Sequence, residues 1–261
     1  MNLELKNKRA LVCGSSKGIG KATAIELALL GAEVTLVARN EELLKESLKE
    51  LSIHAGQKHN YLLVDFSNLQ NLKQVVEKLV LEKEIHILVN NTGGPAAGAV
   101  MGAGVEEFLQ AFNNHLLCNH VLVQTLVPGM KKAAYGRIIN IISTSVKQPL
   151  KGLGVSNAIR AAVANWSKTL SSELAGFGIT VNNVLPGATL TGRLQAIIRD
   201  KSLKSGDSIE SISAEMLSEI PAGRFAEAHE VAAAVAFLAC PAAAYINGIN
   251  LPVDGGRTLS L

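Results

Sequence analysis

The sequence predicts a single α/β domain in which a parallel sheet of seven strands carries helices on both faces, a doubly wound architecture. Short apolar runs alternate with longer helical stretches from the amino terminus to about Pro186. Adjacent parallel strands cannot be joined by a tight turn, so the helices between them are crossover connections. Right-handed crossovers place these helices on both faces. No repeat or low-complexity linker divides the chain, so we expect one domain over residues 1–261.

The expected elements follow one another in β-α-β order. The strands are short apolar runs, at Ala10–Cys13, Glu33–Ala38, Asn60–Val64, Ile85–Asn90, Arg137–Ile142, Thr180–Val184 and Ile249–Val253. The helices are longer stretches, at Ile19–Leu30, Glu41–Leu51, Leu69–Leu81, Glu106–Met130, Ser156–Ala175 and Ala228–Leu238.

The alternation of strands and helices is interrupted once, between Thr189 and Pro221. This stretch is polar and charged, with helical patterns around Leu194–Arg199 and Ile212–Ile220. It follows the carboxyl end of a strand, where ligands bind in open α/β sheets. We therefore expect a flexible lid or substrate-binding loop at about residues 189–221, with a solvated surface excursion as the alternative.

Composition and charge exclude several classes of partner. With 48% hydrophobic and 18% charged residues, the chain has the composition of an ordinary soluble globular protein. The net charge of +3 is small and dispersed, so we expect neither nucleic acid nor a membrane as a partner. Cys13, Cys118 and Cys240 lack metal-ligand spacing, so we expect no metal site and a reduced, cytoplasmic protein. A strand begins almost at once, which leaves no room for a signal peptide, and the apolar run Val231–Cys240 is too short to span a bilayer.

A glycine-rich loop follows the first predicted strand and opens the first helix. Its glycines allow a tight turn, a close approach of backbone amides to a pyrophosphate, and packing of helix on strand. The phosphates then meet the unpaired N–H groups at the positive end of the helix. This strand–turn–helix context favours a Rossmann-type dinucleotide-binding domain over a tight turn without a ligand. The candidate cofactor contacts in the loop are Gly14, Ser16, Lys17, Gly18, Ile19 and Gly20.

The end of the second strand indicates which dinucleotide binds. Proteins that bind NAD usually place an acidic residue here, which accepts hydrogen bonds from the ribose 2′-hydroxyl. This chain has Arg39 at that point and no acid before Glu41. Arg39 offers a planar fork for a phosphate, and Lys17 adds a second positive charge nearby. NADP(H) is therefore favoured over NAD(H), the alternative being that Arg39 is a solvated residue at the start of a helix.

Further motifs follow the glycine loop in a fixed order. They are Val64-Asp65, Leu88–Gly93, Gly136–Ile141, Gly178–Asn182, Pro186-Gly187, Ile246–Gly248 and Val253–Gly256. Together with the glycine loop, this set resembles the short-chain dehydrogenase/reductase family over nearly the whole chain, and most of all its 3-oxoacyl-(acyl-carrier-protein) reductases. The resemblance implies an NADP-dependent oxidoreductase acting on a small carbonyl or alcohol substrate, as a homodimer or homotetramer.

The resemblance also implies specific cofactor contacts. Asp65 would contact the adenine amino group. The adenosine ribose would be lined by Asn90 and Gly93, and the nicotinamide would meet Pro186, Gly187 and Thr191, with Thr191 at the carboxamide.

The catalytic positions depart from the family pattern. Family enzymes hold the substrate carbonyl with a serine and protonate it from a tyrosine. A lysine four residues later lowers the tyrosine's pKa, and an asparagine steadies a relay water. The serine corresponds to Ser143, but the tyrosine, lysine and asparagine positions hold Ser156, Arg160 and His115. Arg160 keeps the positive charge with which it could hold the ribose hydroxyls, yet it does not usefully deprotonate.

The loss of the tyrosine removes the usual acid. A phenol titrates near pH 10 and can be tuned toward neutrality, whereas a serine hydroxyl is a far weaker and shorter donor. The chain's three tyrosines do not obviously substitute: they are Tyr61, Tyr135 and Tyr245, at a strand start, a helix end and the carboxyl-terminal region.

Three replacements for the acid are open. His115 has a suitable intrinsic pKa, with a structural histidine whose hydrogen bonds are satisfied as the alternative. Water could fill the vacated space, held by Ser143 and Ser156. Lys147 and Lys151 flank the expected cleft, although solvated loop charges are the simpler interpretation of both.

Three functions are compatible with these residues. The favoured one is an NADP(H)-dependent oxidoreductase that transfers hydride between nicotinamide and a carbonyl or alcohol, with a 3-oxoacyl thioester as one substrate and an altered proton relay. The alternative is a non-catalytic dinucleotide-binding sensor or partner subunit on the same fold. A lyase or epimerase using the same pocket is the third, because fold alone does not define chemistry.

Overall fold

The computed structural model describes residues 1–260 and contains one parallel sheet of seven strands, in the order β3-β2-β1-β4-β5-β6-β7. The strands are β1 (Arg9–Cys13), β2 (Glu33–Ala38), β3 (Asn60–Leu63), β4 (Ile87–Asn90), β5 (Gly136–Ile141), β6 (Ile179–Pro186) and β7 (Asn250–Val253). This confirms the predicted doubly wound class. The strand order reverses between β1 and β4, and ligands bind beside such a reversal at the carboxyl ends of the strands.

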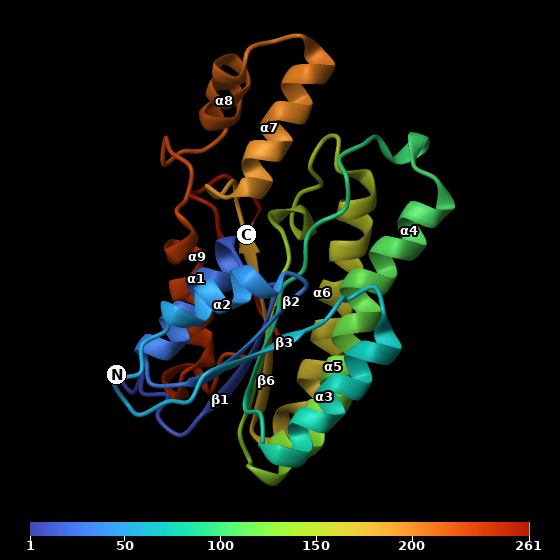
Figure 1. Cartoon of the computed structure of the whole chain (residues 1–261). Helices are drawn as coiled ribbons and strands as arrows, with labels where there is room; N and C mark the ends of the chain where they lie inside the picture. The colour runs from blue at the N-terminus through green and yellow to red at the C-terminus, as the bar shows by residue number, and fades with distance from the viewer. Residues whose placement is uncertain (261) are drawn as a thin grey trace.

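Helices cover both faces of the sheet (Figure 1). One face carries α1 (Gly18–Leu29), α2 (Glu41–Lys49) and α9 (Ala228–Ala239); the other carries α3 (Leu69–Glu82), α5 (Cys118–Lys132) and α6 (Gly154–Leu174). Alternate residues of a strand serve the two cores: Ala10 and Val12 pack on the first face, Leu11 and Cys13 on the second. Burial on both faces explains why these strands are continuous apolar runs.

The predicted helix at Glu106–Met130 is present, but it contains a π-helical turn that the sequence pattern did not indicate. The structure has α4 (Val105–Phe112), a π-helical turn η2 (Asn113–Leu117) and then α5. A π-helical turn holds one more residue than an α-helical turn, so it rotates the side chains within it relative to a straight α-helix. This rotation changes which side chain of the turn faces the site.

The break at residues 189–221 contains two helices that are longer than expected. They are α7 (Gly192–Ser205) and α8 (Ile209–Ser218), which stand above the carboxyl edge of the sheet (Figure 1). They share a small apolar cluster of their own, made of Leu194, Ile198, Ile212 and Met216. The segment is therefore a helical hairpin, and its apolar contacts are separate from the two main cores.

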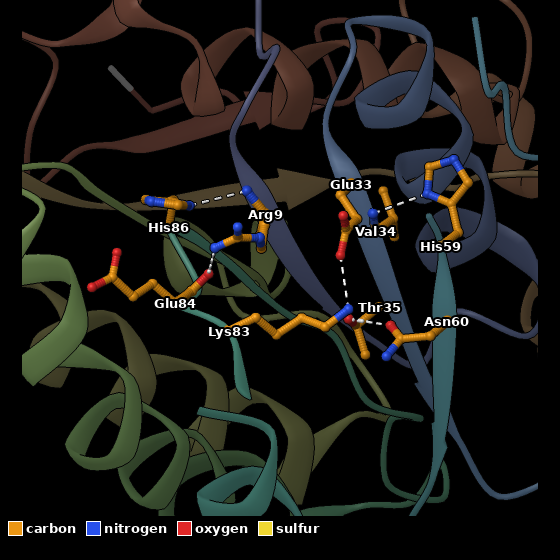
Figure 2. Close-up of polar contacts among 9 residues, drawn as sticks. All are labelled: Arg9, Glu33, Val34, Thr35, His59, Asn60, Lys83, Glu84 and His86. Atoms are coloured by element: carbon orange, nitrogen blue, oxygen red, sulfur yellow. Dashed lines mark hydrogen bonds and ion pairs between the residues drawn. The ribbon is translucent and has the colours of Figure 1, made fainter. Parts of the chain in front are cut away.

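Side-chain contacts link the amino-terminal ends of neighbouring strands (Figure 2). The backbone N–H of Arg9 donates to His86 Nδ1 at 3.1 Å, and that of Val34 donates to His59 Nδ1 at 3.0 Å. An ion pair of 2.8 Å joins Lys83 to Glu33. These contacts occupy the amino-terminal ends of the strands, whereas the carboxyl ends lie on the opposite side of the sheet.

Over residues 1–260, no helix is long and apolar enough to cross a membrane.

Candidate active site

A large cleft of about 890 Å³ lies at the carboxyl ends of the strands and beneath α7. The structure brings most of the predicted site residues into it. Those lining the cleft are Gly14, Ser16, Lys17, Gly18, Ile19, Arg39, Asp65, Gly93, Ser143, Ser156, Arg160, Pro186, Gly187 and Thr191. The predicted residues that do not line it are Gly20, Asn90 and His115.

The glycine loop has a shape that other residues would destroy. Gly14 and Gly18 have φ of 59° and 58°, in the left-handed region where a side chain is strained. A Cβ on Gly20 would lie 2.3 Å from the carbonyl oxygen of Gly14. The loop thus leaves the amides at the start of α1 open to the cleft. These residues fit the pyrophosphate of a dinucleotide.

Arg39 and Lys17 both line the cleft and are exposed, as the predicted 2′-phosphate site requires. Asp65 Oδ2 lies 4.0 Å from Arg39 Nη1. An acidic side chain therefore lies beside Arg39, although the sequence at the end of the second strand contains none before Glu41. The pKa of Asp65 is lowered chiefly by the backbone N–H and hydroxyl of Ser67, which both donate to Oδ1, so the carboxyl is charged at neutral pH.

Asn90 does not line the cleft with its side chain, contrary to expectation. It is 2% exposed, and its Nδ2 donates to Asn140 Oδ1 at 2.8 Å. The neighbouring Asn91 lies in the cleft instead, where its Nδ2 donates to the carbonyl oxygens of Cys13 and Gly14. Successive side chains at a strand end point in opposite directions, so only one of the two can face the cofactor.

Ser143 follows β5 and is half-buried at the cleft wall. Its Oγ accepts a hydrogen bond of 3.1 Å from the backbone N–H of Ser145. Because this contact uses a lone pair, the hydroxyl proton remains available for a substrate oxygen. Ser156 stands in the first turn of α6, on the same cleft.

Arg160 lies one helical turn beyond Ser156 and is only 7% exposed. Its Nη1 donates to the carbonyl oxygen of Ile141 at 3.3 Å. Burial, followed by repulsion from Arg193, lowers the pKa of the Arg160 guanidinium to about 10. Arg160 therefore stays positively charged at neutral pH.

His115 is a poor candidate for the proton donor. It is 2% exposed and does not line the cleft, and its Nδ1 lies 2.6 Å from Thr92 Oγ1. Burial, followed by repulsion from Arg160, lowers the pKa of His115 to about 2. At neutral pH the imidazole is therefore uncharged and does not act as an imidazolium acid. Within the same π-helical turn, the residue that reaches the cleft is Asn114.

No tyrosine takes over the missing acid's place, since none of the three lines the cleft. The Tyr61 hydroxyl donates to Glu41, and the Tyr135 hydroxyl donates to the carbonyl oxygen of Ala239. Tyr245 is fully exposed, in the segment before β7.

Among the polar residues of the cleft that sequence reasoning missed, two bear on the chemistry. Arg193, in the first turn of α7, reaches across the mouth, where its Nη2 donates to the carbonyl oxygen of Pro95 at 2.5 Å. Asn114 Oδ1 is buried and has no hydrogen-bond partner among residues 1–260. Their sequence signals are weak: Arg193 is one of many charges in a polar stretch, and Asn114 depends on the π-helical turn.

Comparisons with known proteins agree with this site. A family model described as enoyl-(acyl carrier protein) reductase matches residues 14–258. The 3-oxoacyl-(acyl-carrier-protein) reductase FabG of Haemophilus influenzae is 35% identical over 257 residues, covering 98% of this chain and 100% of that protein. The NADPH-dependent reductase BacG of Bacillus subtilis is 30% identical over 260 residues, covering 98% and 100%.

Among solved structures, an L-sorbose reductase from Gluconobacter frateurii, complexed with NADPH and L-sorbose, matches with a TM-score of 0.93. It is 32% identical, and the match covers 100% of both chains. The chain belongs to the short-chain dehydrogenase/reductase family. The predicted family and oxidoreductase class are thereby confirmed, and the NADPH-dependent relatives agree with the predicted cofactor.

Proposed function

We propose that this protein is an NADP(H)-dependent oxidoreductase that transfers hydride between nicotinamide and a carbonyl or alcohol substrate, with 3-oxoacyl thioesters among the candidates. The observation that carries the proposal is that Ser143, Arg160 and the glycine loop all line one cleft. The names of the relatives, which include NADPH-dependent reductases and a 3-oxoacyl-(acyl-carrier-protein) reductase, support it.

The chain's own residues supply binding and orientation. The amides at the start of α1 hold the pyrophosphate, and Arg39 with Lys17 pairs with the 2′-phosphate. Pro186, Gly187 and Thr191 support the nicotinamide. When bound, the nicotinamide supplies or accepts the hydride.

The substrate oxygen needs stabilisation as negative charge develops on it. The Ser143 hydroxyl donates a hydrogen bond to that oxygen, and the positive charge of Arg160 stabilises the developing alkoxide electrostatically. Water in the space beside Ser156 passes a proton to the alkoxide, and the hydroxide that remains is reprotonated from bulk solvent through the open cleft. Asn114 Oδ1, buried without a partner among the described residues, offers such a water an acceptor.

The second candidate function is a non-catalytic dinucleotide-binding sensor or partner subunit. The absence of every tyrosine hydroxyl from the cleft favours it. The two functions differ in one measurable property, which is turnover of the bound cofactor.

NADPH oxidation against a panel of carbonyls, with acetoacetyl thioesters included, tests the proposal. We expect slow but measurable oxidation that Ser143→Ala lowers by about tenfold or more, because a hydrogen bond to the developing oxyanion is lost. NADPH binding should stay unchanged in this variant. Tight NADPH binding without oxidation of any substrate would establish the sensor function instead.

We further propose one domain with a lid at residues 189–221, acting as a homodimer or homotetramer in the cytoplasm. An exposed apolar surface on η1 (Val100–Gly102) and α4, with Met101, Val105 and Leu109, supports self-association. Light scattering of the purified protein tests the oligomeric state.

The free, buried cysteines support a reducing compartment.

A further inference from the structure

Two arginines approach one position in the cleft, beside Gly94. A Cβ placed on Gly94 would lie 3.6 Å from Arg160 Nη2 and 3.6 Å from Arg193 Nη2. Arg160 comes from α6 and Arg193 from α7, so the fold brings them together from opposite walls. The space beside Gly94 therefore faces both guanidinium groups.

Neither guanidinium has an acidic partner. Among residues 1–260, no carboxylate lies within 4.0 Å of Arg160 or Arg193. The titratable groups around Arg160 do not compensate its charge. Burial raises the pKa of the Cys118 thiol to about 12, which keeps it neutral, and His115 is uncharged.

The charge of Arg160 is buried without an acidic partner, which is costly, and the like charge of the exposed Arg193 nearby increases the cost. Proteins retain such arrangements where a ligand of opposite charge completes them. The planar fork of a guanidinium matches the two oxygens of a carboxylate or phosphate group. The unbalanced charge at Gly94 is therefore suited to an oxyanion.

We propose that Arg160 and Arg193 bind an oxyanion of the substrate, a carboxylate or phosphate group, at Gly94. The inference rests on the proposed function, since it names the class of substrate that the same cleft reduces. With its anionic end held here, the substrate presents its carbonyl toward Ser143, which lines the same cleft. Binding energy at the anion then orients the reacting group.

The cofactor does not need this position for its pyrophosphate, because the amides at the start of α1 already supply donors for it. A guanidinium has five N–H donors. The contact of Arg160 with Ile141 uses one, which leaves donors both for the nicotinamide ribose and for a substrate oxyanion.

Calorimetric titration of the protein with malonate and with inorganic phosphate, with and without saturating NADPH, tests the site directly. Arg193→Gln removes one charge, and Gly94→Ala places a methyl group at the shared position without a close contact. We expect Arg193→Gln to bind the anion at least tenfold more weakly, as loss of a charged hydrogen bond predicts. Gly94→Ala should also weaken binding, because its methyl group takes space beside the two guanidinium groups. Whichever anion binds more tightly identifies the oxyanion as carboxylate or phosphate.

Two matched controls separate the site from general effects. Arg199→Gln removes the same charge from the same helix at an exposed residue outside the cleft. Gly98→Ala adds a methyl group in the same loop, where nothing lies within 4 Å. Both should bind the anion as the wild-type protein does.

Turnover provides an independent test, in which acetoacetate is compared with its uncharged ester, methyl acetoacetate. We expect kcat/KM at least tenfold higher for the acid, and loss of this preference in Arg193→Gln. If no carbonyl is reduced but malonate or phosphate binds in a manner dependent on Arg193, the proposed function fails and the anion site stands. The inference is overturned if neither anion binds, or if Arg193→Gln weakens NADPH binding and leaves anion binding unchanged.

Discussion

His115 Nδ1 lies 2.6 Å from Thr92 Oγ1, so the histidine is tied to the loop after β4 behind the cleft wall. Thr92 itself lines the cleft, while His115 does not. The imidazole therefore supports the wall through a hydrogen bond and carries no proton to the substrate. This relationship makes the histidine a determinant of stability at low pH.

The free energy of unfolding should fall as the pH drops below about 6.5. In the unfolded chain His115 titrates near pH 6.5, whereas in the folded protein its pKa is lowered to about 2. Between these values only the unfolded state takes up the proton, which costs about 1.4 kcal/mol of stability per pH unit. Urea denaturation between pH 7.5 and pH 5 measures the slope, and His115→Gln should make it shallower.

His54→Gln serves as the matched control, because His54 is exposed between α2 and β3. The free energy of unfolding of His54→Gln should change with pH as steeply as that of the wild-type protein. If His115→Gln retained the wild-type slope, then the imidazole would not be the group that resists protonation.

Arg39→Ala should weaken NADPH binding about tenfold or more, because a charged hydrogen bond to the 2′-phosphate is lost. NADH, which lacks that phosphate, is the matched ligand and should bind the variant and the wild-type protein alike. Fluorescence titration measures both affinities. Equal affinity of the wild-type protein for NADPH and NADH would contradict the assignment of Arg39.

Restoring the family's acid should raise turnover. Ser156→Tyr with Arg160→Lys places a phenol and its lysine on α6, facing the cleft. We expect kcat for a neutral carbonyl such as methyl acetoacetate to rise by about 10² or more, as a general acid typically contributes 10²–10⁴. Each change alone should do less, because the lysine acts by lowering the pKa of the phenol.

Ser156→Phe with Arg160→Lys is the control, since it supplies the same ring without the hydroxyl group. It should be no faster than the wild-type protein, because the ring adds no acid and fills the space that we propose for water. A wild-type rate equal to that of an ordinary reductase would show that another group already serves as the acid.

Hydrogen exchange should be faster in α7 and α8 than in α9. The first two share a small apolar cluster above the sheet, whereas α9 packs on the main core. NADPH should slow exchange at the start of α7, where Thr191 and Arg193 line the cleft. Protection of α7 equal to that of α9 without cofactor would argue against a lid.

The order of strands and helices could be predicted because it depends on local patterns. Apolar runs such as Ala10–Cys13 are buried on both faces, and Gly14 and Gly18 adopt conformations that glycine alone takes easily. The π-helical turn within the predicted helix at Glu106–Met130 could not be found in this way. No residue type marks a π-helical turn, whose geometry depends on packing against α6.

The sequence by itself determined the dinucleotide-binding fold, the family and the absence of tyrosine and lysine from positions 156 and 160, since these follow from residue identity and spacing. Only the tertiary structure decided that Asn91, rather than Asn90, faces the cleft, and that His115 is buried behind Thr92. Side-chain direction depends on where each backbone segment lies. The approach of Arg193 and Arg160 to Gly94 depends on where α7 and α6 lie in the fold, and no local pattern records a distance between segments so far apart in the chain.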